Sequence, residues 1–386
     1  MIFPLGATRR TQHQTAAEIL YDAVVVGGGI SGSIIADELS RAGKRVLVLE
    51  AGIGEDHSIE GYEGYLERFY ASAVKDNQSP YPFNANAPMP RSSDAHRMSP
   101  GQPDSSGYLV QTGPFATDTT YTRVLGGTTM HWEAKTPRML PEDFDVQSRY
   151  GFGRDWPLRY EDLMPFYAQA EREIGVSADV EHQTFLGAHF EPGYVYPMHE
   201  LPLSYLDQVV AKGIDGTFVE VLGDQVELRV RAFPQGRNGV PNPAYDGGRG
   251  FTPVGAVSTS QVEEGGRCQG NNNCVPICPV QAKYNAAKTL SKALERGNVD
   301  LLTQTVASRV ILDPSGRVSG IEVKAYADPN SPRHSTWTVR GRIFVLAASA
   351  IENARLMLAS GLPSSSGLVG HNLMDHAYLL NWSLLP

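Results

Sequence analysis

The chain has 386 residues, of which 41% are hydrophobic and 19% charged, so it is globular and too long for one ordinary domain. Its formal net charge of −9 argues against nucleic acid as a partner, since that role needs a basic face. No run is apolar and long enough to span a bilayer, and no apolar core follows Arg9 and Arg10 as in a secretory signal. We therefore expect synthesis in the cytoplasm. The alternative is a periplasmic or membrane-associated protein that a partner subunit exports or anchors.

The first expected elements follow a loose tail over residues 1–17. Residues 23–26 are wholly apolar, as a buried parallel strand requires, and residues 45–49 form a second such strand after an intervening helix. Glu50 ends this second strand, where a carboxylate can accept hydrogen bonds from ribose hydroxyls. The turn after the first strand is a G-x-G-x-x-G motif, made of Gly27, Gly29 and Gly32. These glycines permit a tight turn, close approach of a pyrophosphate and packing of the helix on the strand. The pattern predicts a dinucleotide-binding fold and leaves NAD and FAD open.

The next stretch of the chain combines a helix, a long loop and a second glycine pair. We expect a helix around residues 65–74 and then a Pro-, Asn- and Ser-rich covering arm over residues 77–107. Gly126 and Gly127 offer a second close approach of the backbone. Polar and aromatic residues stand beside this pair: Thr128, Thr129, His131 and Trp132.

The remaining elements alternate between helices and strands. Residues 160–174 have the apolar spacing of a helix, and residues 180–265 have the short breaks of an antiparallel sheet that bears a substrate site. The later elements are a helix over 288–295, a hairpin of 303–312 with 318–326, a buried strand over 343–347 and a helix over 352–358. The chain ends on an apolar run that looks like an interrupted strand.

All three cysteines lie in one short stretch, C-Q-G-N-N-N-C-V-P-I-C-P, as Cys268, Cys274 and Cys278. Their odd number and close spacing favour metal ligation over pairing. An iron–sulfur cluster suits thiolates on such a tight loop. A zinc site, a disulfide with one free thiol, and three buried structural thiols stay open at this point.

Taken together, these motifs resemble the glucose–methanol–choline (GMC) oxidoreductase superfamily. They are most similar to the flavoprotein subunits of bacterial fructose, gluconate, sorbitol and FAD-dependent glucose dehydrogenases. The resemblance runs from about residue 21 to residue 376. Besides the first glycine motif and the cysteine stretch, it is carried by S-P-Y-P at 79–82, R-V-L-G-G-T-T-M-H-W at 123–132, G-R-D-W-P at 153–157 and G-H-N-L-M-D-H at 370–376.

The resemblance implies an α/β fold, with a Rossmann-like FAD-binding domain of the GMC type and an intertwined antiparallel-sheet substrate domain. It implies FAD rather than NAD, with covalent attachment through His131 or packing of that histidine against the flavin as the two alternatives. It also implies that Cys268, Cys274 and Cys278 hold a 3Fe-4S cluster. The implied cofactor-binding residues are Gly27, Gly29, Ser31, Gly32, Glu50, Arg123, Gly126, Gly127, Thr128, His131, Val306, Asn372, Asp375 and His376.

The sequence departs from the family pattern in three places. Gln269 replaces the second of two adjacent cysteines, and His371 stands where arginine is usual. The catalytic pair of the superfamily, a histidine with a second histidine or an asparagine, has no match in this sequence. We therefore leave the catalytic residues unassigned and expect them beyond Pro386.

The predicted organisation has four parts. A tail over 1–17 precedes the first part of the FAD-binding domain at 18–145, which includes the arm at 77–107. A substrate or cap domain follows at 146–265. The second part of the FAD-binding domain, with the cysteine loop at 268–278, occupies 266–386, and the C-terminal catalytic segment is expected to be absent.

The predicted function is FAD-dependent oxidation of a hydroxyl of a sugar, polyol or sugar-like alcohol. Electrons would leave through the iron–sulfur cluster toward an external acceptor, with a small subunit and a cytochrome as partners. One alternative is a soluble FAD oxidase of a glycoside or natural product with structural cysteines. Another is a catalytically incomplete flavin-binding fragment.

Overall fold

The computed structural model describes residues 12–54, 59–82, 84–89, 121–253, 267–270 and 273–374. They form two compact units. The sheet unit comprises the described parts of 9–54, 83–127 and 293–386, and the helical unit comprises those of 55–82 and 128–292. This division differs from the predicted boundaries, because residues 128–145 and the cysteine loop belong to the helical unit.

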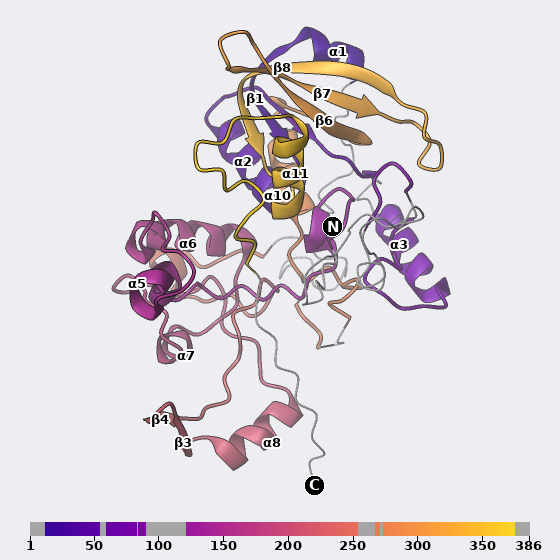
Figure 1. The fold of residues 1–386 in the computed structure, drawn as a ribbon. Helices are drawn as coiled ribbons and strands as arrows, with labels where there is room; N and C mark the ends of the chain where they lie inside the picture. The colour runs from indigo at the N-terminus through magenta and orange to yellow at the C-terminus, as the bar shows by residue number, and fades with distance from the viewer. Residues whose placement is uncertain are drawn as a thin grey trace. The chain divides into compact units, whose positions relative to one another are not determined.

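A six-stranded mixed sheet forms the centre of the sheet unit (Figure 1). Its order is β5-β2-β1-β8-β7-β6. The strands are β1 (Leu20–Val26), β2 (Val46–Leu49), β5 (Val299–Leu302), β6 (Thr305–Leu312), β7 (Val318–Ala325) and β8 (Ser335–Leu346). Strands β5, β2, β1 and β8 run parallel to one another, whereas the pairs β8–β7 and β7–β6 are antiparallel. The predicted Rossmann-like strands and the predicted hairpin are confirmed.

Strand β8 joins the two halves of this sheet. Its first residues pair antiparallel with β7, where Ile321 lies opposite Val339. Its later residues pair parallel with β1, from Leu20 opposite Arg340 to Val26 opposite Leu346. The strand predicted at 343–347 is thus the end of a longer one, and it is not wholly buried, since Ile343 is 60% exposed.

Among the described residues, three helices lie wholly within the sheet unit: α1 (His13–Glu18), α2 (Ile30–Arg41) and α11 (Ala350–Ala359). The predicted loose tail is wrong over its last residues, because they form α1 and Ala16 is fully buried in the core. This core cluster is apolar and draws on strands from both halves of the sheet: Ala16, Tyr21, Val24, Val26, Leu47, Leu49, Leu302, Val310, Ile321, Val323, Val339 and Leu356.

The helical unit contains mostly short elements. Its elements are α3 (Ile59–Ala71), η2 (Pro141–Phe144), α5 (Val146–Tyr150), α6 (Tyr160–Ile174), α7 (Val180–Phe185), α8 (Tyr205–Ile214), β3 (Phe218–Val221), β4 (Asp224–Glu227), α9 (Tyr245–Gly248) and most of α10 (Ala286–Glu295). The short helix η1 (Gly127–Met130) begins at the border of the two units. The predicted helices at 160–174 and 288–295 are confirmed, and the one at 65–74 begins and ends earlier, as α3.

The prediction of many short strands over 180–265 is wrong for the part that is described. Residues 180–253 contain α7, α8, α9 and a single hairpin, β3–β4. The sequence does contain a start signal for α8, since Ser204 followed three residues later by Asp207 is a capping-box pattern. In the structure, the Asp207 N–H donates to the Ser204 hydroxyl at 3.1 Å. The frequent Gly and Pro breaks mark turns here rather than strand ends.

A buried ion pair organises the middle of the helical unit. The Arg138 guanidinium donates twice to the Glu171 carboxylate of α6, each time at 2.8 Å, and lies 4.4 Å from the centroid of the Phe190 ring. The Tyr194 hydroxyl donates to the same carboxylate at 2.5 Å. Both charges are therefore compensated within the fold.

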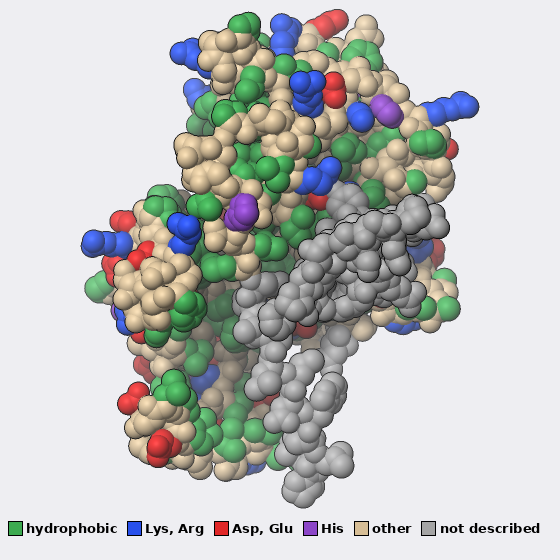
Figure 2. All heavy atoms as spheres, in the orientation of Figure 1, with side chains coloured by type: hydrophobic (Ala, Val, Ile, Leu, Met, Phe, Trp, Pro, Cys, Tyr) green, Lys and Arg blue, Asp and Glu red, His purple; other side chains and the backbone are tan. Residues whose placement is uncertain are grey.

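On the face shown in Figure 2, Lys, Arg, Asp and Glu side chains are scattered over the described surface, and no continuous basic patch is visible. No helix among the described residues combines the length and the apolar character needed to cross a membrane.

Candidate functional site

The turn between β1 and α2 is built so that only glycine fits at two positions. Gly27 has a φ of +107°, and a Cβ there would lie 2.6 Å from the carbonyl oxygen of Ala347. A Cβ on Gly32 would lie 1.9 Å from the carbonyl oxygen of Gly27. The first glycine therefore makes the turn and the third lets the helix pack against the strand, as predicted.

Gly29 lies at the N-terminus of α2 and faces open space. It is the N-cap residue of this 12-residue helix, and no side chain caps the helix there. A Cβ on Gly29 would meet nothing within 4 Å. The free N–H groups of a helix N-terminus attract an anion, and the glycine allows that anion to approach the backbone. The pyrophosphate of a dinucleotide fits this cradle. Ser31, in the first turn, is exposed beside it.

Glu50 is buried and holds this turn in place through hydrogen bonds. One carboxylate oxygen, Oε2, accepts the Gly28 N–H at 2.8 Å, and the other, Oε1, accepts the Gly52 N–H at 2.8 Å. Burial raises the pKa of Glu50, although these N–H groups oppose the shift. The carboxylate therefore holds two loops together within the protein. Its predicted contact with a ribose stays a prediction.

The second glycine pair lies beside the first. The Gly126 N–H donates to the carbonyl oxygen of Gly28 at 3.1 Å, and a Cβ on Gly127 would lie 3.2 Å from the Gly29 Cα. Arg123, in the same segment, forms a 2.7 Å ion pair with Glu352 of α11. The structure thus brings the two predicted glycine motifs together within the sheet unit.

The other predicted cofactor residues lie in different places. Val306 is the second residue of β6 and follows Thr305, whose N–H donates to the Glu50 carbonyl oxygen at 2.9 Å, so Val306 lies close to Glu50 in the fold. Asn372 is exposed, with a φ of +59°, and no described contact joins it to the glycine turn. Asp375 and His376 lie outside the described residues.

Several residues that shape this turn were missed by the sequence analysis. Gly52 allows close packing, because a Cβ there would lie 2.0 Å from the Arg123 carbonyl oxygen. Gln304 has a φ of +54° and lies in the short turn between β5 and β6, so the strand predicted from 303 begins at Thr305 and is preceded by β5, which was not predicted. The signal for Gly52 was the second G-x-G, at 52–54. Gln304 had none.

His131 and Thr128 belong to the helical unit. The His131 ring is 4% exposed, and burial, followed by the charge of Lys283, lowers the pKa of His131 to about 4. The imidazole is therefore neutral at physiological pH. The Thr128 carbonyl oxygen accepts the backbone N–H groups of His131 at 3.1 Å and Trp132 at 3.0 Å, which fixes a tight turn.

Two buried lysines follow the cysteine loop, and neither was predicted. The Lys283 ammonium donates to three backbone carbonyl oxygens, those of Met130, Trp132 and Cys274. Burial lowers the pKa of Lys283 to about 8 and that of Lys288, on α10, to about 7. The sequence held no sign of this, because lysines on a helix usually face solvent.

The three cysteines are reduced, with Cys278 buried and the other two half-buried. Burial raises the pKa of Cys274, the charges of Arg237 and Lys283 oppose this shift, and the thiols of Cys278 and Cys268 add to it. Among the described residues, however, no three His, Cys, Asp or Glu side chains are arranged to hold a metal ion. The set of cluster ligands predicted from the sequence therefore stays a prediction.

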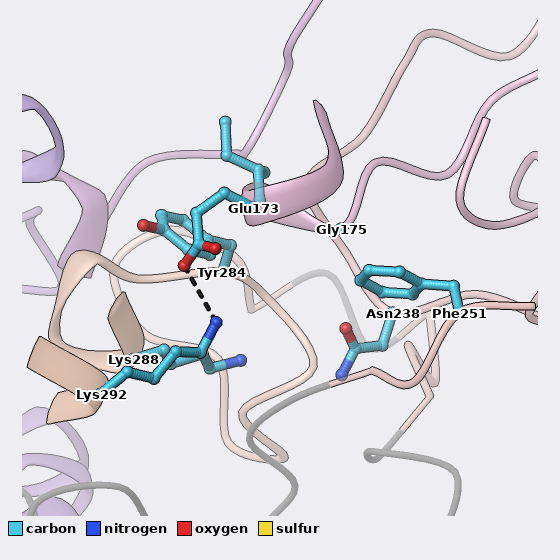
Figure 3. Close-up of a pocket in the computed structure, with 8 residues that line it drawn as sticks. Glu173, Gly175, Asn238, Phe251, Tyr284, Lys288 and Lys292 are labelled. Atoms are coloured by element: carbon cyan, nitrogen blue, oxygen red, sulfur yellow. Dashed lines mark hydrogen bonds and ion pairs between the residues drawn. The ribbon is translucent and has the colours of Figure 1, made fainter. Parts of the chain in front are cut away.

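A small pocket lies in the helical unit near α10 (Figure 3). Lys292 forms a 3.0 Å ion pair with Glu173 there. Its other lining residues are Ile174, Gly175, Asn238, Phe251, Tyr284 and Lys288. Because the Lys292 and Glu173 charges pair with each other, the pocket does not by itself identify a substrate site.

Two family models match parts of this chain, and one of them includes the glycine turn. The family described as GMC oxidoreductase matches residues 223–378, and the NAD(P)-binding Rossmann-like domain matches residues 25–54. The second match covers the end of β1, the glycine turn, α2 and β2. The first covers the cysteine loop and the later strands of the sheet.

Comparison with individual proteins gives relatives of two kinds. The fructose dehydrogenase large subunit of Gluconobacter japonicus is 33% identical over 366 residues, which cover 92% of this chain and 58% of that protein. The paromamine 6'-oxidase of Streptomyces fradiae is 26% identical, with 96% of this chain and 56% of that protein covered. The chain thus spans a little over half the length of these relatives. Among solved structures, pyridoxine 4-oxidase from Mesorbium loti aligns at a TM-score of 0.45 and 19% identity, covering 89% of this chain and 52% of that one.

Proposed function

Because the chain belongs to the GMC oxidoreductase family, we propose that it binds FAD and forms the flavin-binding part of an enzyme that oxidises alcohols. The substrate class that we propose is a sugar, polyol or sugar-like alcohol. The observation that carries the proposal is the uncapped N-terminus of α2, with open space over Gly29 and a second glycine pair beside it.

Bound FAD would supply a hydride acceptor for the carbon that carries the hydroxyl group. The residues of the chain bind and orient it. The N–H groups at the start of α2 hold the pyrophosphate, and Glu50 keeps the Gly28 and Gly52 loops in place around it. A pKa of about 4 makes His131 a weak base, so we assign it to contact with the flavin rather than to proton removal.

Purified protein tests this proposal directly. We expect the chain to bind about one FAD, seen as a flavin absorption spectrum after gel filtration. Sugars and polyols are then screened with an artificial electron acceptor. A protein that binds no FAD at saturating concentration would contradict the proposal. Binding without turnover on any alcohol would favour the alternative of a catalytically incomplete flavin-binding fragment.

The mode of flavin attachment is a separate proposal, in which His131 is covalently linked. A neutral imidazole is the nucleophilic form, and burial keeps His131 neutral. Acid-precipitated wild-type protein is then yellow, whereas His131→Ala releases its flavin. Free release from the wild type would leave only the packing role for His131.

The finer proposal for electron transfer is that the three cysteines bind a 3Fe-4S cluster. Its support is the confinement of all three thiols to one loop, where Cys274 interacts electrostatically with both others. Iron and acid-labile sulfide are measured in anaerobically purified protein, with Cys274→Ser as the control. Iron-free wild-type protein would refute the cluster. A cytochrome and a small subunit are the partners we propose for the cluster-bearing form, with periplasmic or membrane-associated placement through that subunit.

A second candidate function is an FAD oxidase with structural cysteines. The relative from Streptomyces fradiae is named as an oxidase. Oxygen consumption with the best alcohol, compared with reduction of a one-electron acceptor, separates this candidate from a dehydrogenase.

A further inference from the structure

The Lys283 side chain is buried, with 3% exposure, and its ammonium group donates three hydrogen bonds. An ammonium carries three N–H donors and no acceptor. Its donor distances are 2.6 Å to the Cys274 carbonyl oxygen, 2.8 Å to that of Trp132 and 3.1 Å to that of Met130. Three donors thus meet three acceptors, which is the arrangement that lets a buried charge persist in a fold.

Two of these acceptors flank His131 in the chain. The next residues of the Lys283 segment hold the same stretch, because the Tyr284 carbonyl oxygen accepts the Trp132 indole N–H at 2.9 Å. The Ala286 N–H donates to the Thr129 hydroxyl at 2.9 Å. The stretch 128–133, which we call the histidine segment, therefore lies against residues 283–286 through bonds on both sides of His131.

We propose that Lys283 is a positioning residue that holds the histidine segment, and with it the His131 ring, in place for the flavin. The inference rests on the proposed function in one respect, namely the contact of His131 with FAD. The anchoring itself is a property of the chain without cofactor. Because the third bond goes to Cys274, the same ammonium also fixes the middle of the cysteine loop relative to His131.

Lys288 provides a matched control. It is as deeply buried as Lys283, and its ammonium also donates to backbone carbonyl oxygens, at 2.8 Å to Gln281 and 3.0 Å to Lys283. Neither acceptor lies in the histidine segment. A general effect of losing a buried lysine would therefore follow either substitution, whereas a positioning effect follows only Lys283→Met.

Hydrogen exchange by mass spectrometry on the full chain without FAD tests the anchoring. In Lys283→Met we expect amide exchange in peptides covering residues 128–133 to rise on the order of tenfold, because three carbonyl groups lose a charged donor. Lys288→Met leaves that segment at the wild-type rate. If Lys283→Met does not fold, Lys283→Arg keeps the charge but not the three converging bonds, and the same rise is expected.

The second readout uses FAD-loaded protein. Lys283→Met, but not Lys288→Met, should shift the flavin absorption maxima and the fraction of flavin that acid releases. Equal exchange in both variants, or no rise in Lys283→Met and Lys283→Arg, would overturn the anchoring. A rise in exchange with an unchanged flavin spectrum would overturn the positioning role. A wild type that binds no FAD would refute the proposed function and, with it, the flavin part of this inference, while the exchange data still decide the anchoring.

Discussion

Substitution of Gly29 separates binding of the cofactor from folding of the turn. Gly29 has φ and ψ of −80° and −166°, an extended conformation that any residue adopts. A methyl group there enters open space. At Gly32, three residues later on the same helix, the methyl group would be placed 1.9 Å from a backbone oxygen. The two glycines therefore predict opposite outcomes for the same change to alanine.

The magnitudes follow from these surroundings. Gly29→Ala should cost about 1 kcal/mol of folding stability or less, since alanine is only a poorer N-cap than glycine. It should weaken FAD binding by about 2–3 kcal/mol, on the order of a hundredfold in Kd, because it obstructs charged hydrogen bonds to the pyrophosphate. Gly32→Ala should cost about 3 kcal/mol or more of folding stability, since backbone must move.

Two measurements on each variant are sufficient. Urea unfolding of FAD-free protein reports the stability, and flavin fluorescence titration reports the Kd. We expect near wild-type unfolding with weak FAD binding in Gly29→Ala, and a lowered urea midpoint in Gly32→Ala. A Gly29→Ala protein that keeps wild-type affinity for FAD would refute the placement of the pyrophosphate at the start of α2.

Two further predictions concern stability alone. The pKa of Lys288 is lowered from 10.5 to about 7, so between these values the native state binds fewer protons than the unfolded state and stability rises with pH. Lys288→Met should flatten that rise between pH 7 and 9, as measured by urea unfolding at several pH values; an unchanged slope would contradict the cause. Leu222 occupies the β3–β4 turn with a φ of +53° and full exposure, so Leu222→Asn, which gives Asn-Gly, should raise stability by about 0.5–1 kcal/mol, checked by thermal unfolding.

The Rossmann-like half of the fold could be predicted because its signals are local. The apolar run before Gly27 and the glycine spacing specify a strand, a turn and a helix in adjacent residues. The structure places β1, α2 and β2 there, with bounds that differ by a few residues from those expected. The family resemblance was also within reach, because its motifs are continuous in sequence.

The rest of the site depends on contacts between distant residues. The Glu50 carboxylate accepts hydrogen bonds from the Gly28 and Gly52 N–H groups because two loops pack around it. The sequence pattern alone indicated only a ligand as its partner. Lys283 meets Met130 and Trp132 across a large separation in sequence, which no local pattern records. The excess of predicted strands over 180–253 has a different cause, since Gly and Pro mark turns whatever elements they connect.

The double role of β8 has a consequence for synthesis and folding. The glycine turn rests on β1, whose neighbours are β2 on one side and β8 on the other, and β8 is made near the end of the described chain. Until residues 340–346 leave the ribosome, one edge of β1 has no partner, and the whole helical unit is synthesised in between. Pairing over such a distance in sequence is slow, and an open apolar strand edge invites aggregation. We therefore expect expression of this protein to respond strongly to chaperones and to growth temperature, and nascent chains that end before β8 to be unable to complete the sheet.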